Sequence, residues 1–259
     1  MRIWFFSAAA AALLLGACAG GAIPPLGLAA PATAQVTNTA IDAALADPKR
    51  PAADTARDEF RHPREVLQFV HLRPGMRIAD VGPGGGYYTR LFADLVGPSG
   101  HVYGIDRPNR APDQPRAILA VAPQYDNVSV VQQGYLGWTV DQPLDVIFIS
   151  QIYHDFHLTD FHFDVAEINR DMFAQLKPGG ELIIIDHAAN AGADVTSTAD
   201  TLHRIDQAAA RRELEAAGFV FVDESQVLRN PADTHAERVF DSDIRGHTDQ
   251  FVMRFRKPG

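Results

Sequence analysis

A glycine-rich segment, residues 80–86 with the sequence Asp-Val-Gly-Pro-Gly-Gly-Gly, is the clearest candidate for chemistry in this chain of 259 residues. Glycine has no Cβ, so a backbone rich in it can turn tightly and approach a ligand closely. A helix that follows such a turn offers free N–H groups and the positive end of its dipole. Gly82, Gly84 and Gly86 fit the spacing G-x-G-x-G, whereas Tyr87 stands where a dinucleotide fingerprint requires glycine. The segment therefore predicts a site for a nucleotide-like ligand and disfavours a nicotinamide cofactor.

Asp106 is the second candidate, because it follows Gly86 by twenty positions at the end of the next expected strand. In dinucleotide sites an acid about 20 residues after the glycines accepts hydrogen bonds from the ribose hydroxyls. Asp106 fits that role. The alternative is that it only caps a helix or a turn.

Candidates for acting on a second substrate follow two expected strands, 145–149 and 181–185. Open α/β sheets bind ligands at the carboxyl ends of their strands. Imidazole titrates near neutral pH, so His154 and His187 are candidate general bases, and Asp155 is a candidate to orient one of them. Alternatively, these side chains cap helices or line a solvated rim.

The elements that must position these residues alternate between strand and helix from residue 59 onward. The expected strands cover residues 77–81, 101–105, 128–131, 145–149, 181–185, 219–222 and 251–255. The expected helices cover residues 63–70, 87–96, 161–176 and 206–217. This alternation predicts an α/β fold with a mostly parallel sheet and helices on both faces.

These motifs occur in an order that resembles the class I S-adenosylmethionine-dependent methyltransferases. The resemblance rests on the loop 80–86, the acid Asp106, the apolar strand 145–149 and the sequence Leu-Lys-Pro-Gly-Gly at 176–180, and it covers roughly residues 63–259. The amino-acid sequence at 62–63, 84–88 and 228–233 further resembles that of a bacterial group of predicted methyltransferases with N-terminal signal sequences.

The resemblance implies a Rossmann-like, seven-stranded sheet of order 3-2-1-4-5-7-6 whose last strand is antiparallel. It implies S-adenosylmethionine as the cofactor, with contacts from the glycine loop and from the acid: Asp80, Gly82, Gly84, Gly86 and Asp106. After strand three the family usually has an acid that reaches the adenine. Gln133 lies in that stretch here, and its amide is our candidate for the adenine contact.

A metal site is a rival interpretation of the polar residues. His154 and His157, with Asp155 and Asp186, form a plausible ligand set. Catechol-type O-methyltransferases hold magnesium with an acid at the end of strand four, where this chain has Ser150. We therefore expect no metal.

The N-terminus has the features of an export signal. Arg2 precedes an apolar run at 3–17, which is too short to span a bilayer and suits the core of a signal peptide. The run ends in Leu-Gly-Ala-Cys, which resembles a lipobox and predicts lipidation of Cys18, the single cysteine.

Two alternatives remain for the N-terminus: cleavage after Ala-Thr-Ala at 32–34, which would leave no lipid, or an uncleaved anchor. All three place the domain on the periplasmic side of the inner membrane. We expect a signal or anchor region at 1–34, a flexible linker at 35–57 and a methyltransferase domain at 58–259.

The net charge of −9 and the lack of a dense Lys/Arg cluster argue against nucleic acid as a partner. The sequence thus predicts an S-adenosylmethionine-dependent methyltransferase that acts on a small molecule, with oxygen as the favoured acceptor atom. The alternative is a non-catalytic, ligand-binding envelope lipoprotein on the same fold. The oligomeric state is left open.

Overall fold

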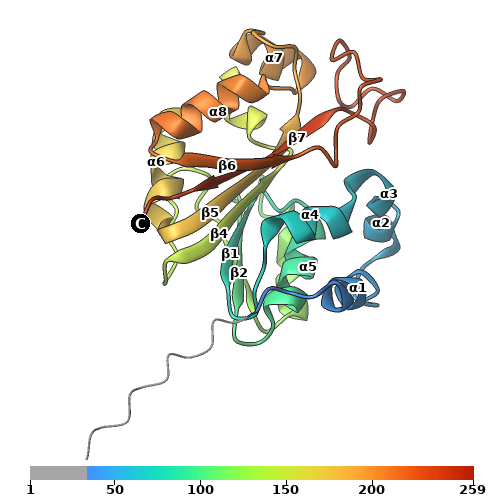
Figure 1. Cartoon of the computed structure of the whole chain (residues 1–259), viewed down its shortest axis with the longest axis vertical. Helices are drawn as coiled ribbons and strands as arrows, with labels where there is room; N and C mark the ends of the chain where they lie inside the picture. The colour runs from blue at the N-terminus through green and yellow to red at the C-terminus, as the bar shows by residue number, and fades with distance from the viewer. Residues whose placement is uncertain (1–33) are drawn as a thin grey trace, which may run out of the picture. The chain divides into compact units, whose positions relative to one another are not determined.

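A seven-stranded sheet forms the centre of the computed structural model, which describes residues 34–259 (Figure 1). The strands are β1 (Arg77–Val81), β2 (His101–Ile105), β3 (Val128–Val131), β4 (Leu144–Ser150), β5 (Leu176–His187), β6 (Val220–Ser225) and β7 (Gln250–Arg256). Their order is β3-β2-β1-β4-β5-β7-β6, and β7 runs antiparallel to both of its neighbours. The fold and strand order predicted from the sequence are confirmed.

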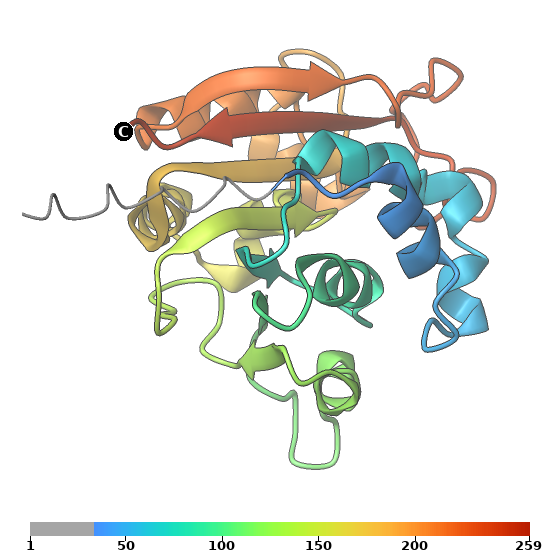
Figure 2. The same cartoon turned by 60° about the horizontal axis from the view of Figure 1, so that its bottom comes forward.

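Helices cover both faces of the sheet (Figures 1 and 2). The helices are α1 (Asn38–Leu45), α2 (Ala52–Thr55), α3 (Asp58–Arg61), α4 (Pro63–Val70), α5 (Tyr87–Val96), α6 (Val165–Gln175), α7 (Val195–Leu202) and α8 (Gln207–Ala216). Helices α1, α4 and α5 lie on one face, and α6 and α8 lie on the other (Figure 1). Neighbouring side chains of a strand point to opposite faces. Accordingly, Val146 and Phe148 pack in one apolar cluster, and Ile147 and Ile149 pack in the other.

Helix α6 begins later than the sequence predicted. Asp164 caps it by accepting a hydrogen bond from the Glu167 N–H at 3.1 Å, so the helix starts at Val165 rather than at residue 161. A short 3₁₀ turn, η4 (Thr159–Phe161), occupies the residues before it. Helix α8 starts as predicted, after Asp206, whose side chain accepts from the Ala208 N–H.

The prediction of a flexible linker at 35–57 was wrong. Helix α1 forms within this segment and buries Ile41 and Ala44 against the apolar cluster that includes α4 and α5. The turn after it is held by Arg50, which is only 5% exposed and donates to both carboxylate oxygens of Asp58 at 2.9 and 2.6 Å. Ile41 and Leu45 are the only large apolar residues of this helix, and two positions among small alanines are too few to establish a hydrophobic period, so the sequence did not reveal this helix.

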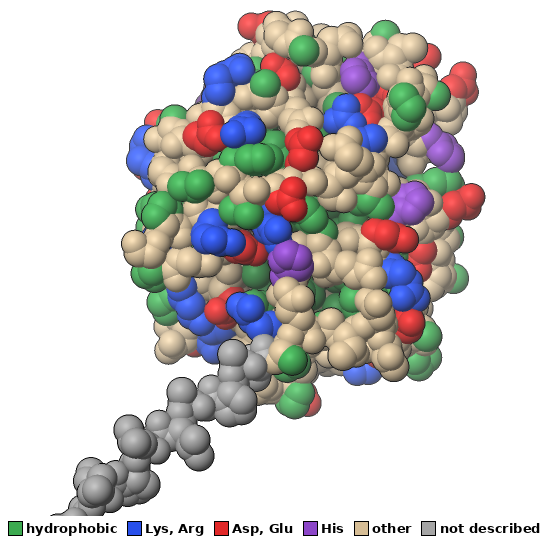
Figure 3. Space-filling model, viewed as in Figure 1, with side chains coloured by type: hydrophobic (Ala, Val, Ile, Leu, Met, Phe, Trp, Pro, Cys, Tyr) green, Lys and Arg blue, Asp and Glu red, His purple; other side chains and the backbone are tan. Residues whose placement is uncertain are grey.

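The predicted signal region and Cys18 lie outside the described residues. Within residues 34–259, none of the helices combines the length and the apolar character needed to cross a membrane. Figure 3 shows acidic and basic side chains interspersed on one face of the molecule.

Candidate cofactor and acceptor site

The glycine loop connects β1 to α5 and needs glycine for two physical reasons. Gly82, Gly84 and Gly86 have φ angles of +68°, +54° and +80°, which residues with a Cβ rarely adopt. A Cβ on Gly82 would also lie 2.4 Å from Cδ1 of Ile152, in the segment after β4. The loop is therefore fixed both by its own backbone and by the chain that passes over it.

A cavity of about 410 Å³ opens beside this loop, and Gly82, Gly84 and Asp106 line it together. Asp106 is 6% exposed, and its Oδ1 accepts a hydrogen bond from the Arg107 N–H at 2.7 Å. Its Oδ2 accepts none of the hydrogen bonds found within residues 34–259. The cavity thus presents a carboxylate oxygen opposite a glycine backbone, which suits the ribose of a nucleoside. The structure therefore brings together three of the residues predicted to bind cofactor.

Two other predicted cofactor residues lie next to this cavity rather than on its wall. Asp80 is buried below the loop, where the Thr89 hydroxyl donates to its Oδ2 at 2.6 Å. Burial raises the pKa of Asp80 to about 6. Gly86 caps α5, and a Cβ there would lie 2.9 Å from Cγ2 of Val121. Gly86 therefore serves in the described structure as the N-cap of α5, where its positive φ and lack of a Cβ are required.

Gln133 is not brought to the cavity. Its side chain is exposed, and its Oε1 accepts from the Thr139 N–H at 3.0 Å. Tyr135, two residues later, lines the cavity instead. An adenine contact from the Gln133 side chain therefore finds no support in this geometry, because the strand end turns that side chain toward solvent.

A second cavity, of about 350 Å³, lies beyond the carboxyl ends of β4 and β5. Its lining residues come from the N-terminal segment, the residue after β4, the end of β5, the loop between β6 and β7, and the start of β7: Arg57, Phe60, Arg61, Gln151, His187, Val239, Phe240, Arg245, Gly246 and Gln250. Gln151 lines this cavity and Ile152 lines the first one, so the two adjoin at consecutive residues.

The second cavity carries positive charge. Arg57 is paired with Asp54 at 2.7 Å, but Arg61 and Arg245 enter none of the ion pairs found in the described part of the chain. Arg61 donates to Oε1 of Gln151 at 2.7 Å, and its guanidinium lies 4.8 Å from the ring centroid of Tyr87. The sequence analysis missed both arginines, because Arg61 falls between the expected linker and the first expected helix, and Arg245 falls in the long stretch between the last two expected strands. The one available signal was their charge.

The predicted bases lie close together but are not equivalent. His154 is 2% exposed, its Nδ1 is 2.7 Å from Oδ1 of Asp186, and its Nε2 is 3.1 Å from Oδ1 of Asp155. Burial acts to lower the pKa of His154, but the two carboxylates outweigh it and raise the pKa to about 10. Burial lowers the pKa of His187 to about 3, and its Nδ1 lies 2.7 Å from the hydroxyl of Thr248. Of the three predicted catalytic residues, only His187 lines the second cavity.

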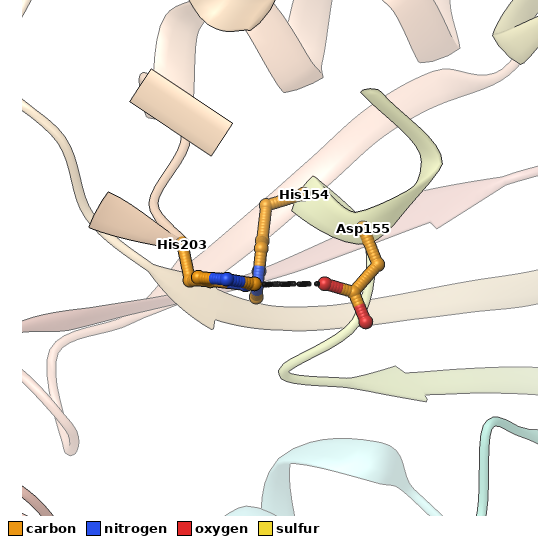
Figure 4. Close-up of side chains that lie close together, drawn as sticks. All are labelled: His154, Asp155 and His203. Atoms are coloured by element: carbon orange, nitrogen blue, oxygen red, sulfur yellow. Dashed lines mark ion pairs between the residues drawn. The ribbon is translucent and has the colours of Figure 1, made fainter. Parts of the chain in front are cut away.

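A third histidine joins this group, and the sequence did not single it out as a site residue. Nδ1 of His203 lies 3.5 Å from Oδ1 of Asp155, and its ring is perpendicular to that of His154 (Figure 4). The metal-ligand set considered from the sequence does not assemble, because the His157 side chain points away from His154 and its Nε2 lies 3.1 Å from Oε2 of Glu213.

Comparison with known proteins decides the family. The sequence model of "Protein-L-isoaspartate(D-aspartate) O-methyltransferase (PCMT)" matches residues 61–209. The chain belongs to this family. The expectation of an S-adenosylmethionine-dependent methyltransferase is thereby confirmed at the level of the family.

Curated relatives of the family are similar to about half of this chain. A protein-L-isoaspartate O-methyltransferase of Methanothrix thermoacetophila is 35% identical over 120 residues, which cover 46% of this chain and 51% of the relative. A protein of the same name from Triticum aestivum is 33% identical over 120 residues, covering 44% and 47%. The match thus spans about half the length of the curated relatives.

Solved structures extend the similarity of fold beyond that matched region. A methyltransferase from Aquifex aeolicus superposes with a TM-score of 0.55 at 21% identity, covering 85% of this chain and 98% of that one. The N-methyltransferase NodS from Bradyrhizobium japonicum, in complex with S-adenosyl-L-homocysteine, gives 0.55 at 18% identity, covering 86% and 100%.

The family match corrects one prediction. The sequence analysis expected a small-molecule acceptor, but the family and its relatives are named for a residue within a protein. That expectation was wrong, and the non-catalytic alternative is not favoured either. The cause is physical: the motifs recognised in the sequence are those that the resemblance assigns to the cofactor, and they carry no information on the acceptor.

Proposed function

We propose that this chain transfers the methyl group of S-adenosylmethionine to a carboxylate of a peptide or protein, as the name of its family describes for isoaspartyl and D-aspartyl residues. The observation that carries the proposal is the family match over residues 61–209. The positive acceptor cavity supports it, because that cavity offers guanidinium groups to a carboxylate.

Methyl transfer to a carboxylate requires no proton transfer by the protein. A carboxylate oxygen attacks the methyl carbon, the carbon–sulfur bond breaks, and a methyl ester and S-adenosylhomocysteine result. A carboxylic acid with a pKa near 4 is ionised at neutral pH and needs no general base. The protein has only to hold the two reactants in line and to exclude competing orientations.

The cofactor residues have separate tasks in this proposal. Gly82 and Gly84 let the backbone approach the cofactor, and the free Oδ2 of Asp106 accepts hydrogen bonds from its ribose. Asp80, just below the loop, supplies negative charge for the ammonium group of the methionine moiety. S-adenosylmethionine itself supplies an activated methyl group.

The acceptor cavity fits a peptide carboxylate in two respects. Arg245 is an exposed cation on the loop between β6 and β7, and Arg61 lies deeper beside Gln151. Guanidinium groups bind carboxylates through paired, charge-assisted hydrogen bonds. Phe240, on the same wall, is 51% exposed and offers an apolar surface for the neighbouring part of a peptide.

The direct test is methylation of a synthetic isoaspartyl peptide by the purified chain, with the aspartyl peptide of the same sequence as control. We expect methyl ester formation on the isoaspartyl peptide only. Arg245→Ala should lower kcat/KM about tenfold, mainly through KM, because it removes one charge-assisted contact with the acceptor. Arg212→Ala, which removes an exposed arginine of α8 that does not line either cavity, should leave both constants unchanged.

Binding of S-adenosylhomocysteine separates the possible failures. If the chain binds S-adenosylhomocysteine but esterifies neither peptide, the acceptor assignment is refuted. If Arg245→Ala weakens S-adenosylhomocysteine as much as it weakens the peptide, this arginine serves the cofactor and the two cavities have been assigned the wrong way.

We further propose that the domain works outside the cytoplasm, within the bacterial group with signal sequences that the chain resembles. The apolar run at 3–17 and the lipobox-like end at Cys18 support this. Mass spectrometry of the mature N-terminus tests this proposal. The expected result is a diacylglyceryl group on Cys18. A mature chain that begins at unmodified Gln35 would refute lipidation and indicate export as a soluble protein.

A further inference from the structure

Three polar side chains meet beside the cofactor cavity with their ligand atoms facing one another: His154, Asp155 and His203 (Figure 4). The first two belong to η3 (His154–His157), and the third ends α7. Nε2 of His154, Oδ1 of Asp155 and Nδ1 of His203 lie within 4.8 Å of one another.

Hydrogen bonding fixes which atom of His154 faces the cluster. The carboxylate of Asp186, which is fully buried, accepts from Nδ1 of His154 at 2.7 Å and from the backbone N–H of His154 at 2.7 Å. In a neutral imidazole, Nε2 then carries a lone pair and points at the carboxylate of Asp155. Two acceptors 3.1 Å apart repel unless a positive charge lies at or between them.

His203 adds a third candidate ligand atom. Its Nδ1 is buried and has no hydrogen-bond partner among the residues that the structure describes. Its backbone adopts a left-handed conformation with φ of +54°. A residue in this conformation commonly ends a helix, as His203 ends α7.

From these contacts we propose that His154, Asp155 and His203 bind one divalent transition-metal ion, with zinc as the ion that the ligand set favours. Zinc accepts imidazole and carboxylate ligands at about 2.0–2.2 Å in a tetrahedron, which puts neighbouring ligand atoms about 3.3 Å apart. The two distances to Oδ1 of Asp155, 3.1 and 3.5 Å, bracket that spacing. Three protein ligands leave the fourth position of the tetrahedron for water or substrate.

The surroundings of the cluster are those of a metal site. Histidine ligands usually donate their second N–H to a carboxylate, which fixes the ring and raises its basicity, and Asp186 does this for His154. Asp155 also lines the cofactor cavity. The proposed ion therefore lies at the edge of the cavity that Gly82, Gly84 and Asp106 line.

One contact opposes the ion. Nη2 of Arg238 lies 3.3 Å from Nε2 of His203, and coordination through Nδ1 would place a proton on that Nε2. Arg238 is exposed and would have to move aside. Arg238→Gln should therefore strengthen metal binding, since glutamine can accept that proton and removes a positive charge near the ion. A purely structural histidine cluster gives no reason for this gain.

The test is titration of the tag-free chain, first stripped with a chelator, with Zn²⁺ and with Co²⁺ as a spectroscopic probe. We expect one equivalent to bind, with the visible absorption of tetrahedral Co²⁺. His203→Ala should abolish this binding, and Asp186→Asn should weaken it roughly 10- to 100-fold. His162→Ala removes an exposed histidine outside the cluster and should change nothing.

The competing occupant is a proton on His154, held between Asp155 and Asp186. If neither ion binds saturably, or if His203→Ala binds as tightly as the parent chain, the cluster is an imidazolium ion pair and the metal site is refuted. Circular dichroism of each variant identifies any loss that comes from misfolding. Because the assay measures binding alone, its result is independent of the proposed methyl transfer.

Discussion

Replacement of Asp106 by alanine tests whether the cavity beside the glycine loop binds a nucleoside. One carboxylate oxygen already accepts from the Arg107 N–H at 2.7 Å, which leaves Oδ2 for the ribose hydroxyls. Charge-assisted hydrogen bonds contribute about 1.5–3 kcal/mol, so their loss should weaken S-adenosylhomocysteine binding roughly 10- to 100-fold. Isothermal titration calorimetry measures the change directly. Asp106→Asn should cost less, because the amide oxygen still accepts one hydrogen bond.

The matched control is Asp113→Ala, which removes the same charge from an exposed position that does not line the cavity. We expect wild-type affinity for it. If Asp106→Ala binds S-adenosylhomocysteine as tightly as the parent chain, the ribose assignment is wrong. If Asp113→Ala weakens binding equally, then the general electrostatic field, rather than contact with Asp106, controls affinity.

Two further predictions concern the stability of the same region. Gly82→Ala should lower the free energy of unfolding by about 1–3 kcal/mol, because its Cβ would lie 2.4 Å from Ile152 and its φ is +68°. Adding Ile152→Ala should restore part of this stability, as measured by urea denaturation. A double mutant whose two effects are strictly additive would refute the clash. The second prediction concerns Asp80. Burial raises its pKa from 3.8 to about 6, so the folded state binds more protons than the unfolded state between these values and stability falls as pH rises through that window. At about 1.4 kcal/mol per pKa unit, the loss of stability is about 3 kcal/mol. Asp80→Asn should abolish this pH dependence of the free energy of unfolding, measured with urea between pH 4 and 7. An unchanged dependence on pH in this variant would assign the effect to another group.

The parts of the fold that could be predicted from the sequence are those with strong local patterns. The expected bounds of β1, β2, β3, α4 and α5 coincide with the observed ones. Periodicity fails for the N-terminal helices, where stability comes from distant partners. Asp54, for example, pairs with Arg90 at 2.6 Å, and Arg90 also donates to the carbonyl of Gly85 in the glycine loop. No local pattern at 35–57 encodes such contacts.

The same distinction explains which half of the site could be predicted. The cofactor half depends on a short loop whose backbone needs glycine, so Gly82 and Gly84 reveal it. The acceptor half is assembled from segments far apart in the chain, among them Arg61 and Arg245. Individual arginines carry no periodic signal, and only the folded sheet brings them to one cavity. His203 was missed as a cluster member for the same reason.

The two halves of the site are connected at Gln151 and Ile152. Gln151 has φ of +62°, its N–H donates to the Ile185 carbonyl at 2.7 Å, and its side chain bridges Arg61 and Gln250 at 2.7 and 3.0 Å. Ile152 packs over Gly82, so the next residue fixes the cofactor loop. Methyl transfer requires reacting atoms about 3–3.5 Å apart and in line. In the proposed reaction, Gln151 and Ile152, which line the two adjoining cavities, set how far apart the two reactants lie.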